Sequence, residues 1–363
     1  MKQYLLLTYL FSIIFFACNF HPENREGRRV RQVVDTIGFA HLSWQFDSVI
    51  SRISLLQAEE LNKSMVSPYI FWRTAICPHD DYTYVGWHYP AILKNIKAKT
   101  VIIFGVAHRA KQFGLADKLV FEGFEGWQSA YGEIKVSWLR NEIVEKLPID
   151  MLIVHDSMHM VEHSIESMLP FLQHFNSDVE IIPVLVPYMN FERMQQISIS
   201  LASCINQVMD KHNMIWGNDF ALLITTDAVH YGDEEWGGKN YAPFGVDSMG
   251  YLRAVDHEHE IINNCFVGEL TEERIKRFFE YTVDPNNYME YQWTWCGRYS
   301  VPFGLLTTLK LNSLSKNVPL NGHFIGYTNS IDHEPIPFDD LGMGRTAIAT
   351  QRHWVGYASV GFE

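Results

Sequence analysis

Short apolar runs recur along the chain, and each has the length of a buried strand. The clearest are FWRTAIC (71–77), KTVIIFGVAH (99–108), VEIIPVLVP (179–187) and DFALLITT (219–226). Apolar side chains occupy both alternating sets of positions in these runs, which indicates strands that are covered on both faces. One shorter candidate and two C-terminal ones complete the predicted set: DMLIVH (150–155), NGHFIGYT (321–328) and HWVGYASVGF (353–362).

Segments with helical spacing separate these runs. We expect helices within residues 38–66, 191–212, 247–266, 271–281 and 297–315, and over EHSIESMLPFLQHF (162–175). Pro170 lies inside EHSIESMLPFLQHF and predicts a kink or a late helix start there. Strands that are apolar on both faces and alternate with helices indicate an α/β fold. We predict a single domain with a largely parallel central sheet flanked by helices.

The N-terminal stretch MKQYLLLTYLFSIIFFACNF looks like an export signal. Its apolar core, Tyr4 to Ala17, follows Lys2 and is too short to span a bilayer comfortably. Cys18 stands where the core ends, which resembles a bacterial lipoprotein box; an ordinary signal peptide with a coincidental cysteine is the alternative. We expect a lipoprotein signal peptide at 1–17, a lipid-anchored tether at 18–37 with lipid on Cys18, and the folded domain at 38–363. The protein would then lie in the cell envelope, held to a membrane and facing the periplasm or the surface.

Composition narrows the range of partners. The chain has 363 residues, of which 47% are hydrophobic, so it can bury a large core. The formal net charge of -13 disfavours nucleic acid as a partner, because nucleic-acid binding needs a basic surface. The cysteines after Cys18 are irregularly spaced and form no CxxC pair, so we expect mostly free or metal-ligating thiols. These cysteines are Cys77, Cys204, Cys265 and Cys296.

Candidate chemistry gathers where the strong strands end. His79 follows the first strand, His108 ends the second, and Asp227 and His230 follow DFALLITT. In an open α/β sheet, the carboxyl ends of parallel strands meet at the ligand crevice. The chain has 16 histidines, so some coincidence is expected, but three in corresponding positions indicate a shared site.

Cys296 is a candidate for a further ligand. It stands in WTWCGRYS, directly before Gly297 and an amphipathic run, and a thiol at a helix N-terminus favours the thiolate. Two imidazoles with one soft ligand suit a transition metal, although a buried structural cysteine is the alternative. In the segment 162–175, His163 and Glu166 are three residues apart and would share a helix face, where a carboxylate can fix the tautomer of a ligating histidine. An ordinary surface helix start would look the same.

Six stretches, in this order, resemble the Memo family, which includes the bacterial AmmeMemoRadiSam system protein B type. The resemblance covers about residues 70–363, and EHSIE and CGR are its most specific parts. It implies the fold of the class III extradiol ring-cleaving dioxygenases. The stretches are PHDDYTYVG from Pro78, GVAHR from Gly105, EHSIESMLPFL from Glu162, TTDAVHYG from Thr225, CGRYSVPFG from Cys296 and GYASVGF from Gly356.

The resemblance also implies roles for individual residues. His79, His108 and Cys296 would face the metal, with Cys296 in place of the carboxylate that the related dioxygenases use. His230 would match the acid/base histidine of those enzymes, and Asp227 would orient it. His163 would lie in the pocket wall or behind the ligands.

This sequence departs from the family pattern near the first histidine. Asp80 and Asp81 replace the usual Ala-Gly, and could add a ligand, raise the basicity of His79 or bind a second cation. Arg109 would bring positive charge to the edge of the pocket. Tyr84 is a candidate for the pocket wall, with core packing as the alternative.

These observations predict a Memo-like metal-binding protein with a mononuclear His/Cys site. If it is an enzyme, we expect a metal-dependent, dioxygenase-like oxidoreductase. Iron or copper would suit the site best, and zinc is a further option. The alternative is a non-catalytic module that binds a peptide or small-molecule ligand in the same pocket. A metallohydrolase ranks last, because the sequence contains no HExxH.

Overall fold

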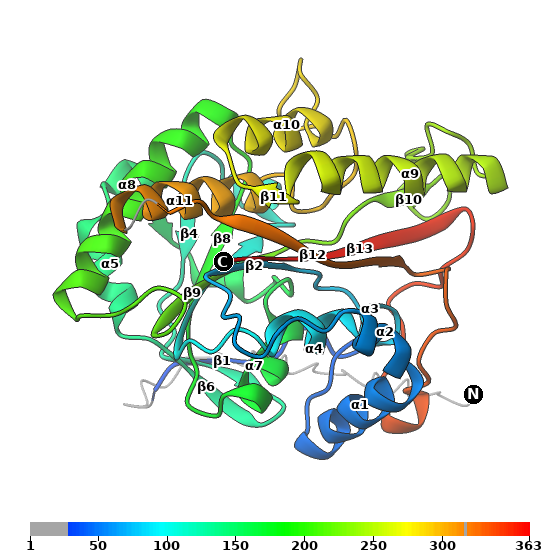
Figure 1. Ribbon diagram of the computed structural model, residues 1–363, viewed down its shortest axis with the longest axis horizontal. Helices are drawn as coiled ribbons and strands as arrows, with labels where there is room; N and C mark the ends of the chain where they lie inside the picture. Colours follow the sequence, from blue (N-terminus) through cyan, green and yellow to red (C-terminus); the bar gives the residue numbers. More distant parts are fainter. Residues whose placement is uncertain (1–27, 316–317) are drawn as a thin grey trace, which may run out of the picture.

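The computed structural model describes residues 28–315 and 318–363, which form one mixed sheet with helices on both faces (Figure 1). The predicted signal peptide, the lipidation of Cys18 and the first half of the predicted tether fall on residues 1–27, outside the described part, and stay predictions. None of the helices described is both long and apolar enough to cross a membrane.

The sheet has the strand order β1-β5-β6-β8-β3-β9-β2-β13-β12-β11, and β4, β7 and β10 pair beside this path. The strands of the described residues are β1 (Val30–Arg31), β2 (Thr74–Cys77), β3 (Thr100–Val106), β4 (Leu119–Phe121), β5 (Gly126–Ser129), β6 (Gly132–Val136), β7 (Leu152–Val154), β8 (Glu180–Val186), β9 (Phe220–Thr225), β10 (His230–Gly232), β11 (Gly268–Glu269), β12 (Asn321–Asn329) and β13 (His353–Phe362).

The sheet is parallel at its centre but not throughout. Strands β6, β8, β3, β9 and β2 pair in parallel, whereas β13, β12 and β11 pair antiparallel beyond β2. The prediction of a largely parallel sheet was wrong for this end of the sheet. The antiparallel pairing follows from the connection between the strands. β12 and β13 are adjacent in the sheet and are joined by a loop instead of a crossover helix, which makes them antiparallel.

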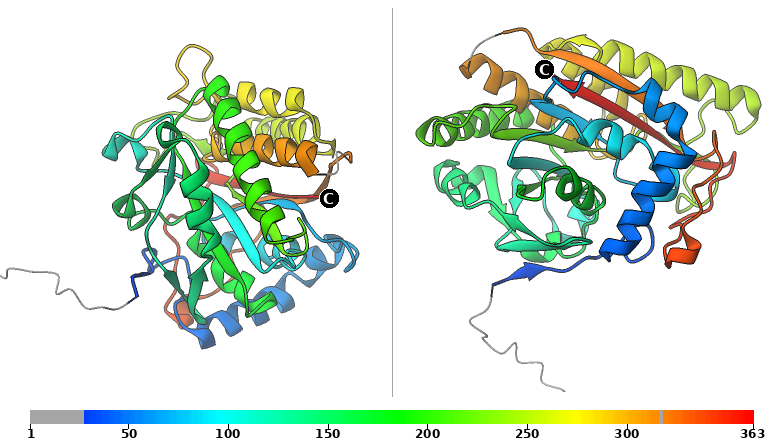
Figure 2. Two further views of the ribbon diagram at one scale, coloured as in Figure 1. Left: turned by 90° about the vertical axis from the view of Figure 1, so that its left-hand side faces the viewer. Right: turned by 60° about the horizontal axis from the view of Figure 1, so that its bottom comes forward.

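Two hydrophobic cores lie on the two faces of the sheet, as the apolar runs predicted. Along β3, Ile102 and Phe104 pack into the core beneath α8 and α11, while Val101 and Ile103 pack into the opposite core. Figure 2 shows these helical layers from two further directions. The helices are α1 (Ser43–Leu56), α2 (Ala58–Lys63), α3 (Tyr82–Val85), α4 (His88–Leu93), α5 (Leu139–Lys146), α6 (Asp156–His159), α7 (Leu169–Phe175), α8 (Phe191–Lys211), α9 (Ser248–Cys265), α10 (Glu272–Thr282) and α11 (Ser300–Ser315).

The helix predicted over 162–175 begins late. A 3-10 turn spans Glu166–Met168, and α7 starts at Leu169 with Pro170 in its first turn, where a proline needs no hydrogen-bonded N–H. Residues 162–165 are therefore not helical, and the expectation that His163 and Glu166 share a helix face was wrong.

The segment 30–37 belongs to the folded domain, so the predicted tether does not extend to residue 37. Strand β1 pairs in parallel with β5. Arg31 is buried, forms an ion pair with Glu166, donates to the carbonyl oxygen of His159 over 2.8 Å, and lies 4.1 Å from the ring centre of Trp127. A buried guanidinium needs such partners, and together they fix the segment to the sheet.

Replacing Glu166 by Ala should leave Arg31 buried without its counter-charge. The Glu166 carboxylate also accepts the backbone N–H groups of Val34 and Asp35, at 2.7 and 3.0 Å. We expect the free energy of unfolding to fall by about 3 kcal/mol or more, measured by urea unfolding. Glu145→Ala on the exposed face of α5 is the control and should change it little. Equal effects of the two substitutions would contradict the assignment.

Candidate metal centre

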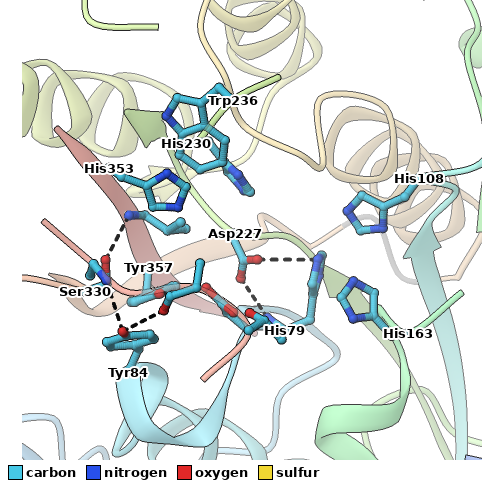
Figure 3. A pocket seen from close by; sticks show the side chains of 15 residues that line it. His79, Tyr84, His108, His163, Asp227, His230, Trp236, Ser330, His353 and Tyr357 are labelled. Atoms are coloured by element: carbon cyan, nitrogen blue, oxygen red, sulfur yellow. Dashed lines mark hydrogen bonds and ion pairs between the residues drawn. The ribbon is translucent and has the colours of Figure 1, made fainter. Parts of the chain in front are cut away.

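A cavity of about 170 Å³ opens at the carboxyl ends of the central strands (Figure 3). The ends of β2, β3 and β9 lie at one edge because these strands pair side by side in parallel. The cavity is lined by His79, Asp80, Tyr84, His108, His163, Asp227, His230, Trp236, Ser330, Thr346, Ala347, Ala349, His353, Val355 and Tyr357. In Figure 3, His79, His108 and His163 stand together across the cavity from His230, Trp236 and His353.

Asp227 holds His79 in place. The Asp227 carboxylate accepts the backbone N–H of His79 over 2.9 Å, and its other oxygen lies 3.5 Å from Nε2 of the same residue. Both residues are almost fully buried. The resemblance implied that Asp227 would orient His230, whereas the hydrogen bond that the structure describes goes to His79.

Cys296 lies beside this pair. Its Sγ atom is 3.6 Å from His79 Nε2 and accepts the backbone N–H of Asp227 over 3.1 Å. Gly297 permits this approach, because a Cβ atom there would lie 2.3 Å from Cβ of Thr226 at the end of β9. Helix α11 starts at Ser300 and not at Gly297 as predicted, so the N–H that reaches the thiol belongs to the strand loop and not to the helix.

His108 is held by a second buried carboxylate, that of Glu162. Glu162 accepts the His108 backbone N–H over 2.8 Å and lies 2.9 Å from its Nδ1 atom. The same carboxylate accepts the N–H groups of His163 and Ser164, at 3.0 and 2.9 Å. Gly105 allows Ile165 to pack on β3, since a Cβ atom there would lie 2.8 Å from Ile165. The loop that carries Glu162 is therefore held against the end of β3.

The side chains of His79, His108 and Cys296 could together hold one metal ion. The candidate ligand atoms of His79, His108 and Cys296 all lie within 4.8 Å of one another. In a tetrahedral site, metal–sulfur and metal–nitrogen distances of about 2.3 and 2.0 Å place S and N about 3.5 Å apart, close to the 3.6 Å between Cys296 Sγ and His79 Nε2. With Nδ1 of His108 on Glu162, its Nε2 atom is left for a metal, the usual arrangement of a ligating histidine.

The electrostatics of the site depend on burial. Burial, together with the neighbouring His108, lowers the pKa of His79 well below its ordinary value. Burial and the nearby Asp227 raise the pKa of Cys296, and burial and Asp80 raise the pKa of Asp227. In the absence of a cation, these shifts favour the neutral forms of His79 and Cys296 and make the charged form of Asp227 less favourable than it is in solvent. A bound cation favours the thiolate and carboxylate forms, because its positive charge offsets the cost of burying these anions away from solvent.

His108 and Glu162 form the charged pair of the site. Burial lowers the pKa of His108, but the Glu162 charge outweighs it and the net shift is upward. Burial raises the pKa of Glu162, but the charge of His108 and the hydrogen bonds to the carboxylate bring it well below its usual range. The ring of His163 lies 5.3 Å from that of His108, and its Nδ1 is 3.4 Å from Asp35 in the N-terminal segment.

His230 faces the cavity from the opposite wall. Its Nε2 atom is buried and has no hydrogen-bond partner among the described residues. Burial, then His108 and His353, lower the pKa of His230 to about 3, so the ring is neutral. Trp236 lies 5.2 Å from the ring of His230 and stacks on His353 at 4.1 Å. Sequence reasoning missed Trp236 and His353, because Trp236 lies in the loop after β10 and His353 is the first residue of β13, and both stand just outside the recognised stretches.

The other predicted pocket residues divide into two groups. Asp80 lines the cavity and accepts the Tyr357 hydroxyl over 2.7 Å, and Tyr84 lines it too. Asp81 instead accepts the backbone N–H of Thr346 over 2.6 Å, which anchors the C-terminal loop. Neither aspartate has a positive φ, so the backbone here does not require the glycine of the family pattern.

Like Asp81 and Cys296, the predicted residues Glu166 and Arg109 do not line this cavity. Glu166 pairs with Arg31, behind the site. Arg109 is exposed and lines a separate hollow beside residues 34–37.

Glu258 is a buried carboxylate that the sequence did not single out. It lies on α9 and accepts the indole N–H groups of Trp293 and Trp295, at 2.6 and 2.8 Å, and the backbone N–H of Val229 over 3.1 Å. It therefore joins the loop before His230 to the turn before Cys296. Burial raises its pKa to about 7, although these hydrogen bonds favour the charged form. The position of Glu258 in a helical segment of the sequence does not by itself indicate this role.

Comparisons with known proteins indicate the same family by two routes, a family model and individual relatives. A family model described as Memo-like protein matches residues 52–339. A MEMO1 family protein of Methanosarcina barkeri is 30% identical over 161 residues, 43% of this chain and 54% of the relative. MEMO1 family proteins of Saccharolobus islandicus and Pyrococcus furiosus are each 29% identical, over 44% and 47% of this chain and 54% and 55% of theirs. The chain spans about half the length of the curated relatives it matches.

Glu258 should make the stability of the metal-free protein depend on pH. The folded protein holds a proton on Glu258 up to about pH 7, whereas the unfolded chain releases it near 4.5. Between these values the folded state binds more protons, so stability falls as pH rises, by up to about 3 kcal/mol from this group. Urea unfolding of Glu258→Gln from pH 4.5 to 8 should show a smaller fall than the parent protein. Asp256→Asn, exposed on the same helix, should retain the parent slope, and an unchanged slope in Glu258→Gln would refute the role.

Proposed function

This chain belongs to the Memo-like protein family, and from that premise we propose that it binds one transition-metal ion through His79, His108 and Cys296 and, when that ion is redox-active, uses O₂ as the oxidant of a small ligand. The observation that carries the proposal is the donor set itself. Two imidazoles and a thiol converge at one end of the sheet, from three separate segments of the chain.

The donor set suits iron or copper, with zinc as a further option. When bound, the metal would supply Lewis acidity and, if redox-active, a path for electrons. The residues around it provide orientation. Asp227 and Glu162 fix the backbones of His79 and His108, and the side chains of His79 and Cys296 are almost fully buried, whereas that of His108 is 33% exposed.

His230 is the residue that we assign to proton transfer. Its Nε2 atom is buried, lines the cavity and has no partner among the described residues, so it is free to hold a proton from a ligand placed between it and His79. Trp236 packs against the ring of His230 and stacks on His353 in the same wall of the cavity. A ligand in a cavity of about 170 Å³ would be a small molecule or one side chain of a peptide.

A non-catalytic module is the second candidate function, and the aromatic wall of the same cavity favours it. Trp236, Tyr357 and Tyr84 give the apolar surface that a ligand pocket usually has. The two candidates differ in what His230 does, and this difference decides between them.

The His79→Ala, Cys296→Ala double variant should lose the metal. We expect near-stoichiometric iron, copper or zinc in the parent protein purified without chelator, and loss of most of it in the variant, because two of three ligands are gone. Elemental analysis measures this, with circular dichroism to show that the fold survives. His212→Ala, Cys204→Ala removes the same residue types away from the site and should keep the metal. Equal metal contents in the parent and the site variant would exclude this set of ligands.

Replacing His230 by Ala should separate catalysis from binding. We expect the metal to remain while the rate of ligand oxidation falls by about 100-fold or more, through loss of the proton acceptor. Oxygen consumption by metal-loaded protein with a panel of small aromatic ligands measures the rate, and His174→Ala, outside the cavity, is the control. Full activity in His230→Ala would contradict its role. A parent that binds ligand but shows no turnover with any oxidant supports the binding module.

A further inference from the structure

A second, smaller hollow reaches the candidate metal ligands from another side. It has a volume of about 60 Å³, and His108 and Cys296 form part of its wall. Arg298, two residues after Cys296, lines the same hollow together with Tyr188, Tyr291 and Tyr299. Arg298 belongs to the stretch CGRYSVPFG but has no part in the proposed metal chemistry.

Arg298 is a buried cation that has no counter-charge among the residues that the structure describes. Only 4% of its surface is exposed. Its Nη2 atom donates to the carbonyl oxygen of Met289 over 3.0 Å, and its Nε atom is buried with no hydrogen-bond partner in the described part of the chain. Within residues 28–315 and 318–363, no carboxylate oxygen pairs with this guanidinium at 4.0 Å or less.

The buried Arg31 and the partly buried Arg140 are both compensated. Arg31 pairs with Glu166, and Arg140 pairs with Glu122 at 2.9 Å. A guanidinium is always charged and carries five N–H donors, so an arginine that only fastens a loop would be expected to find similar partners. Arg298 does not, although the chain has 42 acidic residues.

Three tyrosine rings surround the charge instead. The guanidinium carbon lies 3.4 Å from the ring centre of Tyr291, 4.7 Å from that of Tyr299 and 5.7 Å from that of Tyr188. Cation–π contacts hold the guanidinium in place but contribute no net negative charge. The site thus has a fixed cation, an unpaired donor and open volume beside it.

We propose that this hollow binds a small carboxylate, held by the Arg298 guanidinium next to His108 and Cys296. A carboxylate is planar with two acceptor oxygens, which matches the donor fork of arginine, and the hollow is small enough to favour it over a bulkier anion. The carboxylate site stands on Arg298 alone. That it holds the anionic end of a ligand whose other end reaches the metal rests on the proposed function.

Saturation-transfer NMR with formate and acetate on the purified chain tests the site. We expect saturable binding in about the millimolar range, since ligands of three or four heavy atoms bind no tighter. Arg298→Gln should weaken it by about tenfold or more through loss of the charge, and Arg298→Lys should weaken it less. Neutral acetamide should not bind. Arg109→Gln, an exposed arginine on the other side of His108, should bind as the parent does.

Several results would overturn the proposal. These are no saturation in the parent, equal binding of acetamide and acetate, unchanged binding in a folded Arg298→Gln, or loss of binding in Arg109→Gln. Inorganic phosphate that binds where formate does not would overturn the choice of a carboxylate. If Arg298→Gln does not fold, the parent, acetamide and Arg298→Lys measurements still decide.

The same titrations on chelator-treated and metal-loaded protein keep the two proposals separate. Carboxylate binding that persists without metal supports the Arg298 site whether or not the metal assignment holds. Metal uptake without carboxylate binding would contradict the Arg298 site and leave the proposed function standing.

Discussion

The contact on which the rest of the site depends is that between Asp227 and Cys296. The backbone N–H of Asp227 donates to Cys296 Sγ, while its carboxylate accepts the N–H of His79. One residue at the end of β9 therefore fixes two of the three candidate ligands. This works only because β2 and β9 are parallel neighbours, so that Cys77 stands beside Thr225 and the loops that follow leave the sheet together.

Buried carboxylates set the geometry around this contact. Asp227, Glu162 and Glu258 are each buried, and each accepts N–H groups from segments that carry site residues. Such groups are costly to bury alone, and the N–H donors offset much of that cost while they bring separate loops together. By the same principle Arg298 is exceptional, because it is buried and no carboxylate of the described part of the chain pairs with it.

Much of this arrangement was predictable from local pattern. The apolar runs identified the central strands, and their ends identified His79, His108 and Asp227, because a parallel sheet gathers the carboxyl ends of its strands. The antiparallel pairing of β12 and β13 was not predictable, since nothing in the apolar runs 321–328 and 353–362 specifies how these two runs are connected.

The partners of individual side chains were also beyond the sequence. Glu166 does not share a helix face with His163, because the helix starts only at Leu169, with Pro170 in its first turn. Asp227 contacts His79 instead of His230. That Arg298 has no counter-charge among the described residues is known only from the positions of its neighbours in the structure. Periodicity reports which face of an element is buried, but not which polar atom meets which.

X-ray absorption spectroscopy of the metal-loaded protein tests the central claim most directly. With His79, His108 and Cys296 as ligands, the first shell should contain one sulfur at about 2.3 Å and nitrogen atoms at about 2.0–2.1 Å, and Cys296→Ser should lose the sulfur alone. A first shell of oxygen and nitrogen only in the parent protein, identical to that of Cys296→Ser, would contradict the account.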